Sequence, residues 1–236
     1  MTSRVDDNGA AYAGSQLQTQ LYVNKRADQL DAAIRDAFGD ELAGASFEWR
    51  SPLADDRYAE YWDPAFLKRL KLDDHVDALG TFWAKRGGPH WDALALVTQP
   101  GHEHPGVLLV EGKSYPDEML KGSGLTATDP QSTHTIEKAL AWTQGVLGIP
   151  LNTAAWTGPL YQNANRLAHV YWLRSRGVRA WLVHLLFTGD KRSPTTAHEW
   201  HDALTQADKA LGLTGVTVDA ARHVLLPAGS RDDLLS

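Results

Sequence analysis

The sequence has 236 residues, 43% hydrophobic content and a formal net charge of −6. This length suffices for one sizeable core, and the lack of cysteine excludes disulfides, thiolate metal sites and a cysteine nucleophile. No run of about 18 apolar residues occurs, so we expect no membrane span. The absence of cysteine is compatible with a reducing cytoplasm, which is the expected location. The acidic balance disfavours steering of the whole protein toward nucleic acid, although a local basic groove is compatible with it.

The first third of the chain predicts a tail and then mostly helices. Residues 1–15 are small and polar and predict a disordered tail, with a single domain over 16–236 whose core spans about 46–187. Helical spacing of apolar residues predicts one helix over 17–38 that ends at Gly39. The next predicted elements are a short strand at 46–49, a helical stretch over 55–70 and a helix that Asp73 caps and that runs through Lys85.

The remainder alternates between strands and helices. Residues 91–97 and 107–115 predict two strands, and the Gly- and Pro-rich segment between them predicts a hairpin loop. That loop contains His102, Glu103 and His104, which we interpret as loop residues and not as a zinc site. The further predicted elements are helices over 132–147, 160–176 and 195–210, and strands over 179–187 and 222–226. The sum predicts an α/β fold with helices on either side of a mixed central sheet.

Three charged residues interrupt the apolar hairpin at one end. If the strands pair symmetrically about their loop, Asp92 lies across from Glu111, with Cβ atoms roughly 5 Å apart. Lys113 projects from the same face as Glu111, because residues two apart share a face. Two carboxylates in this relation are suited to Mg²⁺ or Mn²⁺, and Lys113 would act on a water or on phosphate charge. The alternative is a strand end where Lys113 neutralises two exposed acids.

The two strands also resemble a known family. The segments Gly88-Pro89-His90-Trp91-Asp92 and Val107-Leu108-Leu109-Val110-Glu111-Gly112-Lys113 are similar to the signature strands of the PD-(D/E)xK nuclease superfamily, with His90-Trp91 as a departure. The resemblance implies a restriction-endonuclease-like fold, here with extra N- and C-terminal helices. It further implies that Asp92 and Glu111 bind metal, that Gly112 adds its carbonyl oxygen, and that Lys113 assists catalysis.

The resemblance also extends to the helix after these strands. Gln162 and Arg166 are four residues apart on one predicted helical face, and the superfamily often carries an accessory glutamine there. We therefore expect a catalytic role for Gln162 and substrate binding by Arg166, Asn165 and Tyr161. The alternative is a merely solvated polar face.

Other residues are weaker candidates for the same site. The resemblance also implies a glutamate of the first core helix as a further metal ligand, for which Glu60 is the candidate and Asp63 and Glu41 are weaker options. The alternative is that Glu60 is a plain surface residue of a helix. Lys121 is a further substrate-binding candidate, and Lys85 and Arg86 would help to line a basic groove. The Gly-, Ser- and Thr-rich stretch 121–133 would cover the substrate.

The expected function is a Mg²⁺- or Mn²⁺-dependent nuclease, with DNA favoured and RNA left open, acting as a monomer or a homodimer. One alternative is a catalytically inactive binding module of the same fold. Another is a scaffold protein whose aromatic surface binds protein.

Overall fold

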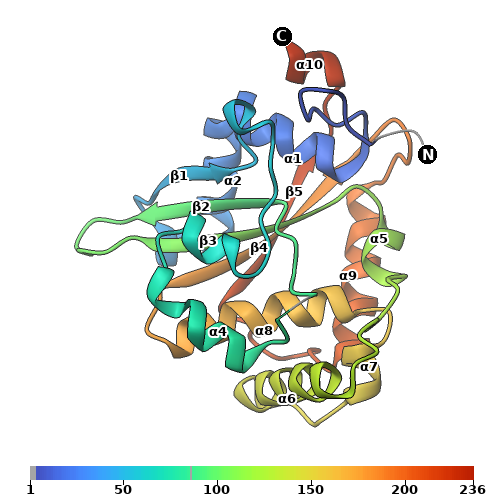
Figure 1. The fold of residues 1–236 in the computed structure, drawn as a ribbon. Helices are drawn as coiled ribbons and strands as arrows, with labels where there is room; N and C mark the ends of the chain where they lie inside the picture. Colours follow the sequence, from blue (N-terminus) through green and yellow to red (C-terminus); the bar gives the residue numbers. More distant parts are fainter. Residues whose placement is uncertain (1–3, 86) are drawn as a thin grey trace.

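The computed structural model describes residues 4–85 and 87–236 and contains a five-stranded sheet between layers of helices (Figure 1). The strands lie side by side in chain order, β1 (Ser46–Ser51), β2 (Ala93–Thr98), β3 (Gly106–Lys113), β4 (Ala180–Thr188) and β5 (Ala221–Pro227). The first three strands are antiparallel, whereas β3, β4 and β5 run parallel. The predicted α/β class with a mixed sheet flanked by helices is therefore confirmed.

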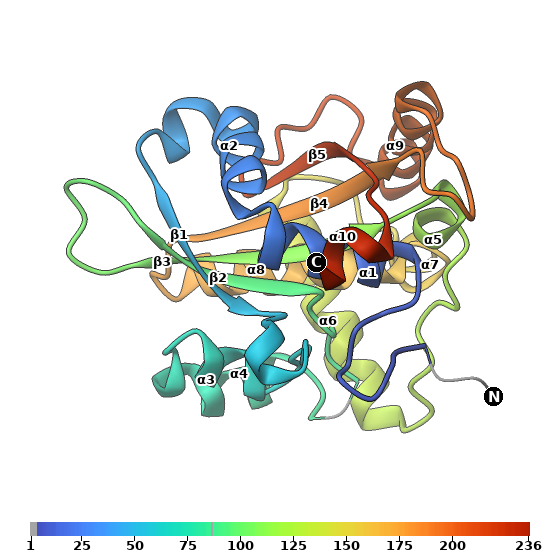
Figure 2. The ribbon, with the colours of Figure 1, turned by 90° about the horizontal axis from the view of Figure 1, so that it is seen from above.

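Helices cover both faces of this sheet. They are α1 (Gly14–Lys25), α2 (Ala27–Phe38), α3 (Ala65–Arg69), α4 (Val76–Phe82), α5 (Pro116–Leu120), α6 (Pro130–Val146), α7 (Thr153–Thr157), α8 (Tyr161–Ser175), α9 (Ala197–Leu211) and α10 (Arg231–Leu235). Figure 1 shows α1 and α2 on one side of the sheet and α6 and α8 on the other, while α10 lies against α1 (Figure 2). In the described part of the chain, no helix is long and apolar enough to cross a bilayer.

The central strands β2, β3 and β4 are almost wholly buried because helices cover both of their faces. Alternate residues of β2 and β3 join different cores: Leu94 and Leu109 pack toward α8, whereas Ala93 and Leu108 pack toward α2. All eight residues of β3 are buried. Glu111 and Lys113 at the end of β3 are charged and yet buried, so neighbouring groups must balance their charges.

The predicted hairpin register is confirmed along β2 and β3. Val97 pairs with Gly106 and Ala93 pairs with Val110, so the regular ladder ends one residue before Asp92. The long crossover through α5 to α8 then returns the chain to β4, which lies parallel to β3. This topology brings α8 to the same sheet face as the side chain of Glu111.

Several predicted boundaries are wrong. The helix expected over 17–38 is two helices, because Arg26 (φ −131°, ψ 32°) leaves the helical region between α1 and α2. The expected tail is ordered over its described part: Ala10 and Ala11 are buried against Leu234 of α10. The expected core of 46–187 is too short as well, since β5 completes the sheet and α2 packs on it.

The stretch 55–70 is helical only at the short turn η2 (Ala54–Asp56) and over α3. Its middle is extended, because Tyr61 pairs with Trp91 in an antiparallel bridge. Likewise, the helix expected over 73–85 is a 3₁₀ turn, η3 (Asp73–His75), followed by the shorter α4.

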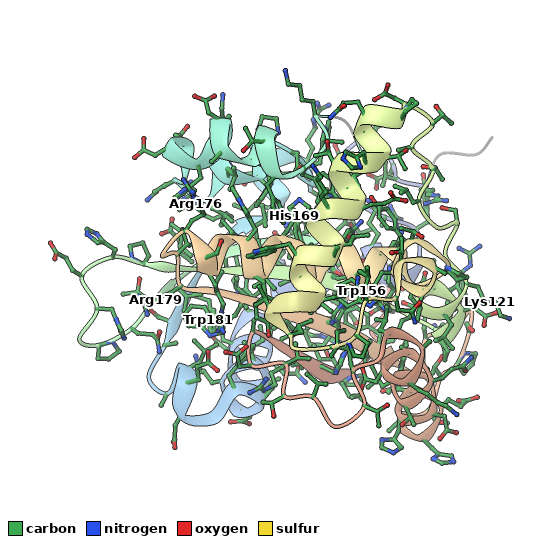
Figure 3. All side chains as sticks on the ribbon, turned by 90° about the horizontal axis from the view of Figure 1, so that it is seen from below. Lys121, Trp156, His169, Arg176, Arg179 and Trp181 are labelled. Carbon is green, nitrogen blue, oxygen red and sulfur yellow. The ribbon has the colours of Figure 1, made fainter. Side chains whose placement is uncertain are left out.

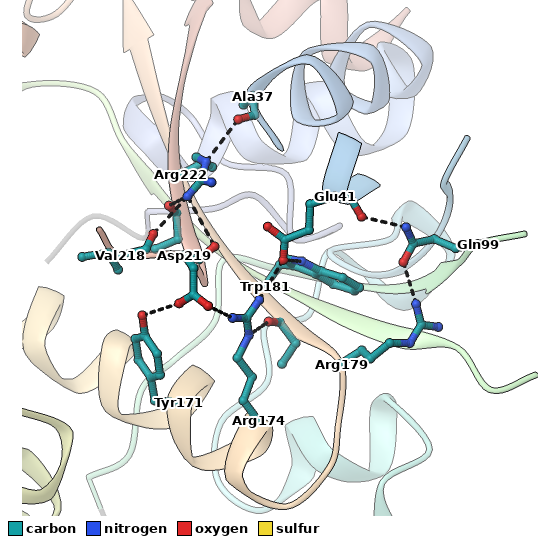
Figure 4. Close-up of polar contacts among 12 residues, drawn as sticks. Ala37, Glu41, Gln99, Tyr171, Arg174, Arg179, Trp181, Val218, Asp219 and Arg222 are labelled. Atoms are coloured by element: carbon teal, nitrogen blue, oxygen red, sulfur yellow. Dashed lines mark hydrogen bonds and ion pairs between the residues drawn. The ribbon is translucent and has the colours of Figure 1, made fainter. Parts of the chain in front are cut away.

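A polar network closes the end of the sheet where β4 begins (Figure 4). Glu41, in the turn η1 (Gly39–Leu42), accepts hydrogen bonds from Arg174 at 2.9 Å and from the Trp181 indole at 2.6 Å. Asp219 accepts hydrogen bonds from Tyr171 at 2.7 Å and from Arg174 at 2.8 Å. Glu41 therefore has a structural role at the end of the sheet where β4 begins, and the suggestion that it binds metal is wrong.

Candidate active site

The carboxyl end of β3 places Glu111 and Lys113 side by side on the α8 face. Lys113 Nζ lies 2.5 Å from Glu111 Oε1 and donates a second hydrogen bond, of 3.1 Å, to Gln162 Oε1 at the start of α8. Glu111 and Lys113 are only 3% and 7% exposed. The ion pair is therefore enclosed, and the exposed Gln162 lies at its solvent side.

Arg166, one helical turn after Gln162, binds the other oxygen of the same carboxylate. Its Nε and Nη2 lie 2.8 and 2.6 Å from Glu111 Oε2. Nη2 also donates to the His90 carbonyl at 2.8 Å, and the guanidinium lies over the Trp91 ring at 5.2 Å. The predicted shared face of Gln162 and Arg166, directed at Lys113 and Glu111, is thus confirmed.

Asp92 approaches this pair through the backbone of Gly112. Its Oδ2 accepts a 2.6 Å hydrogen bond from the Gly112 amide, while its own amide donates to the Val110 carbonyl at 3.1 Å. The N–H and C=O of one strand residue point to the same side, so the Gly112 carbonyl is directed toward β2 as well. A side chain at residue 112 would meet Thr19 Oγ1 at 2.5 Å, which explains the glycine.

Glu60 joins the cluster, but not from a helix as expected. The bridge between Tyr61 and Trp91 puts Glu60 in register with Asp92, and Gln16 of α1 donates a 3.0 Å hydrogen bond to Glu60 Oε1. Burial raises the pKa of Glu60, and the charge of Glu111 raises it further. The location of Glu60 near the predicted ligands agrees with its expected role, although its secondary structure does not.

The three carboxylates have unequal electrostatic environments. Burial raises the pKa of Asp92 well above its ordinary value, and the charges of Glu111 and Glu60 raise it further. Burial also opposes ionisation of Glu111, but Arg166 and Lys113 overcome this and lower its pKa to about 2. Three carboxylates thus share two cations, which lower the pKa of Glu111 but do not outweigh the burial of Asp92 and Glu60.

His184 is a further residue of this site that the sequence analysis missed. It is the register partner of Glu111 on β4, and its ring stacks on His223 of β5 with centroids 5.2 Å apart. Burial lowers the pKa of His184 to about 3, so it is neutral at pH 7. Its neighbour Asn163 lines with it a cavity of about 200 Å³ between α8 and α9. The available signal was an imidazole in the middle of an otherwise apolar strand.

Asn165 and Tyr161, which were expected to bind substrate, are buried instead. Asn165 Oδ1 accepts a 2.7 Å hydrogen bond from Arg166 Nη1, and Asn165 is 3% exposed. Burial raises the pKa of Tyr161 to about 12, and its hydroxyl interacts with Asn165. These residues therefore position Arg166, and their predicted direct contact with substrate is not supported.

The predicted basic groove does not form around this cluster. Lys121 points outward at the periphery (Figure 3), where it pairs with Asp117 at 2.8 Å. Lys85 is exposed beside α4, and Arg86 lies outside the described residues. The stretch expected to cover substrate contacts the end of α7 and the turn before α8 instead, since Gly122 donates to the Pro159 carbonyl and Leu125 donates to the Thr157 carbonyl.

Asp63 was the second alternative to Glu60 as a ligand. Its Oδ2 lies 3.5 Å from Nε2 of the buried His169, within an aromatic cluster. A side chain at residue 88 would meet Asp63 Oδ2 at 2.0 Å, so Gly88 is required for this packing. Asp63 therefore packs beside a buried histidine in an aromatic cluster and has a structural role.

Comparisons with family models, with curated proteins and with solved structures find no match to this chain. Within residues 4–85 and 87–236, no group of three or more His, Cys, Asp or Glu side chains is placed so that it could hold a metal ion. The site must therefore be interpreted from its own chemistry.

Proposed function

We propose that this protein is a divalent-metal-dependent phosphodiesterase that cleaves nucleic acid, with DNA favoured. The observation that carries the proposal is the group of three carboxylates, Asp92, Glu111 and Glu60, beside the buried Lys113 at one strand end. An uncompensated negative charge of this kind is expensive to bury unless a cation completes it. The finer fold that we propose with this activity is restriction-endonuclease-like, and the proposed location is cytoplasmic.

The types of donor, carboxylate and carbonyl oxygens, are those that Mg²⁺ and Mn²⁺ prefer. Asp92 and Glu60 supply hard carboxylate oxygens, and a bound cation would offset the burial and the neighbouring negative charge that raise their pKa values. Gly112 would add its carbonyl oxygen on the same side, and Glu111 would contribute an oxygen next to its ion pairs. When bound, the metal would supply Lewis-acid stabilisation of phosphate charge and lower the pKa of a bound water.

Lys113 is best suited to stabilise charge. Burial opposes its protonation, but Glu111 and Asp92 outweigh this and raise its pKa. A lysine that stays protonated at neutral pH cannot accept a proton from water. It can donate a hydrogen bond to a phosphate oxygen as negative charge develops there.

Gln162 and Arg166 have separate roles in this proposal. Gln162 is exposed and already accepts from Lys113, so it can orient water or phosphate at the entrance. Arg166 is 5% exposed and holds Glu111, which makes it a positioning residue.

The test is a cleavage assay on single- and double-stranded DNA and RNA with Mn²⁺ or Mg²⁺, and with the metal chelated. Wild type should cut only with metal, and Asp92→Asn and Glu111→Gln should each abolish cutting. Asp117→Asn is the matched control, because Asp117 is an acid on α5 that pairs with the exposed Lys121. Equal cutting by Asp92→Asn and wild type would disprove the proposal.

The second candidate is a binding module of the same fold that performs no chemistry. It is favoured by the two cations that occupy both oxygens of Glu111, because they compete with a metal for that carboxylate. Nucleic-acid binding by a protein that cuts nothing in the same assay would support it. A homodimer is compatible with either candidate and is tested by sedimentation.

A further inference from the structure

An exposed aromatic pair lies directly beside the carboxylates. The rings of Trp62 and His90 stack with centroids 4.7 Å apart and planes inclined by 18°. Trp62 is 50% exposed, and His90 is exposed as well. A half-exposed tryptophan held rigidly against a second ring presents a flat apolar surface to solvent.

The backbone fixes the position of this pair relative to the site. Trp91 donates a 3.0 Å hydrogen bond to the Tyr61 carbonyl in their antiparallel bridge. Trp62 and His90 flank this bridge on one side, and Glu60 and Asp92 flank it on the other. Since alternate residues of an extended strand share a face, the aromatic pair and the two carboxylates face the same way, about 7 Å apart along the chain.

A second exposed aromatic side chain follows the end of β3. Tyr115 follows Lys113 by two residues and is 36% exposed. It lines a groove of about 950 Å³ with Tyr12, Arg4 and Arg192, and this groove reaches Gln16, which holds Glu60. The groove therefore carries two aromatic side chains, and its lining contains two arginines, Arg4 and Arg192, and two acids, Glu118 and Asp190.

We propose that the Trp62–His90 pair stacks a base of a single-stranded nucleic acid whose neighbouring phosphate lies at Asp92 and Glu111. This inference rests on the proposed function and names its substrate class. Base–aromatic stacking requires an unpaired, unstacked base, because a duplex covers the faces of its bases. The His90 carbonyl also holds Arg166, so the platform and the ion pairs at Glu111 are fixed to one another.

The test measures binding without catalysis. A fluorescently labelled 12-nucleotide single strand and the matching duplex are titrated with protein under chelator, and anisotropy is recorded. Trp62→Ala should weaken single-strand binding by about 5- to 150-fold, the range that stacking of one base gives. Trp62→Tyr should retain most of the affinity, whereas Trp62→Leu, which keeps apolar bulk without a π face, should lose it.

Trp142→Ala is the matched control. Trp142 is 37% exposed on α6 and contacts Phe82 instead of the site, so its loss should leave binding unchanged. Thermal melts of each variant verify folding. Unchanged single-strand affinity in both Trp62→Ala and Trp62→Leu, or a wild type that prefers the duplex, would overturn the inference. Trp62-dependent binding by a wild type that cuts nothing with Mn²⁺ would uphold it and refute the proposed activity alone.

Discussion

Arg166 binds one oxygen of Glu111 with two of its nitrogens, at 2.8 and 2.6 Å, across 55 residues of chain. Lys113 holds the other oxygen at 2.5 Å. The carboxylate that a metal would share is therefore fixed in place by two protein cations. This arrangement determines how the site should respond to mutation, metal and pH.

Removing Arg166 while Glu111 remains should strongly destabilise the protein. Arg166→Met leaves Glu111 with one cation in a buried environment, and we expect a loss of about 3–5 kcal/mol in the free energy of unfolding. Adding Glu111→Gln to Arg166→Met should recover part of this loss. Urea denaturation of both single variants and the double variant measures the coupling. The control is Arg26→Met, whose pair with Asp233 is more exposed and should cost about 1 kcal/mol or less. Additive effects at Arg166 and Glu111 would contradict the expectation.

Replacing Lys113 should lower the cleavage rate as well as the stability, because it also leaves the buried Glu111 with a single cation. Lys113→Met keeps most of the aliphatic stem but removes the charge, so nucleic-acid cleavage should fall by about 100-fold or more. The rate is measured under single-turnover conditions with Mn²⁺. Lys121→Met removes a lysine that is exposed and paired with Asp117, and it should cut like wild type. Equal rates for Lys113→Met and wild type would exclude the proposed role.

Asp92 should destabilise the metal-free protein. Because its pKa is raised in the fold, stability falls as the pH rises from the ordinary aspartate range toward the raised value. At pH 7, Asp92→Asn should therefore raise the melting temperature, by about 2–4 °C for each kcal/mol gained. A lower melting temperature for this variant would show that the buried charge is already compensated.

Metal binding should offset the destabilisation that the buried Asp92 carboxylate causes in the wild-type protein. Mn²⁺ that binds only the folded protein raises its melting temperature, and Asp92→Asn should lose that rise. Scanning calorimetry with Mn²⁺ and with chelator gives both values. Asp117→Asn should keep the wild-type response, and a full response in Asp92→Asn would move the metal elsewhere.

His184 should make the fold sensitive to mild acid. Its pKa is about 3 in the folded protein against an ordinary 6.5, so its contribution is complete above pH 6.5 and is lost as the pH falls toward 3. At pH 5 the loss should be on the order of 2 kcal/mol relative to pH 7. His184→Leu should lose correspondingly less stability between these pH values in urea denaturation. An identical pH dependence in wild type and His184→Leu would contradict this expectation.

The hairpin was predictable because its information is local. Strand alternation and the Gly- and Pro-rich loop predicted the pairing of Val97 with Gly106, and the ladder confirms it to Ala93. The position of Lys113 on the same face as Glu111 follows from their two-residue spacing along the strand. The turn of α8 likewise required Gln162 and Arg166 to share a face. Each of these relations lies within one hairpin or one helical turn.

Apolar periodicity did not predict element boundaries where no glycine, proline or capping residue marks the end of a helix. It did not detect the break at Arg26, because apolar spacing continues across it. It also assigned Glu60 to a helix, because the aromatic residues around it fit helical spacing. The bridge from Tyr61 to Trp91 overrides that spacing with a pairing to a distant segment.

The sequence by itself determined the α/β class, the hairpin register as far as Ala93 and the common face of Glu111 and Lys113. Only the tertiary structure decided which cations hold Glu111, which histidine lies beside it and which acid joins Asp92. Those contacts depend on the crossover that sets β4 parallel to β3 and on packing of α8 over the sheet. Such long-range geometry is fixed by how whole elements bury their apolar faces, and no local residue pattern encodes it.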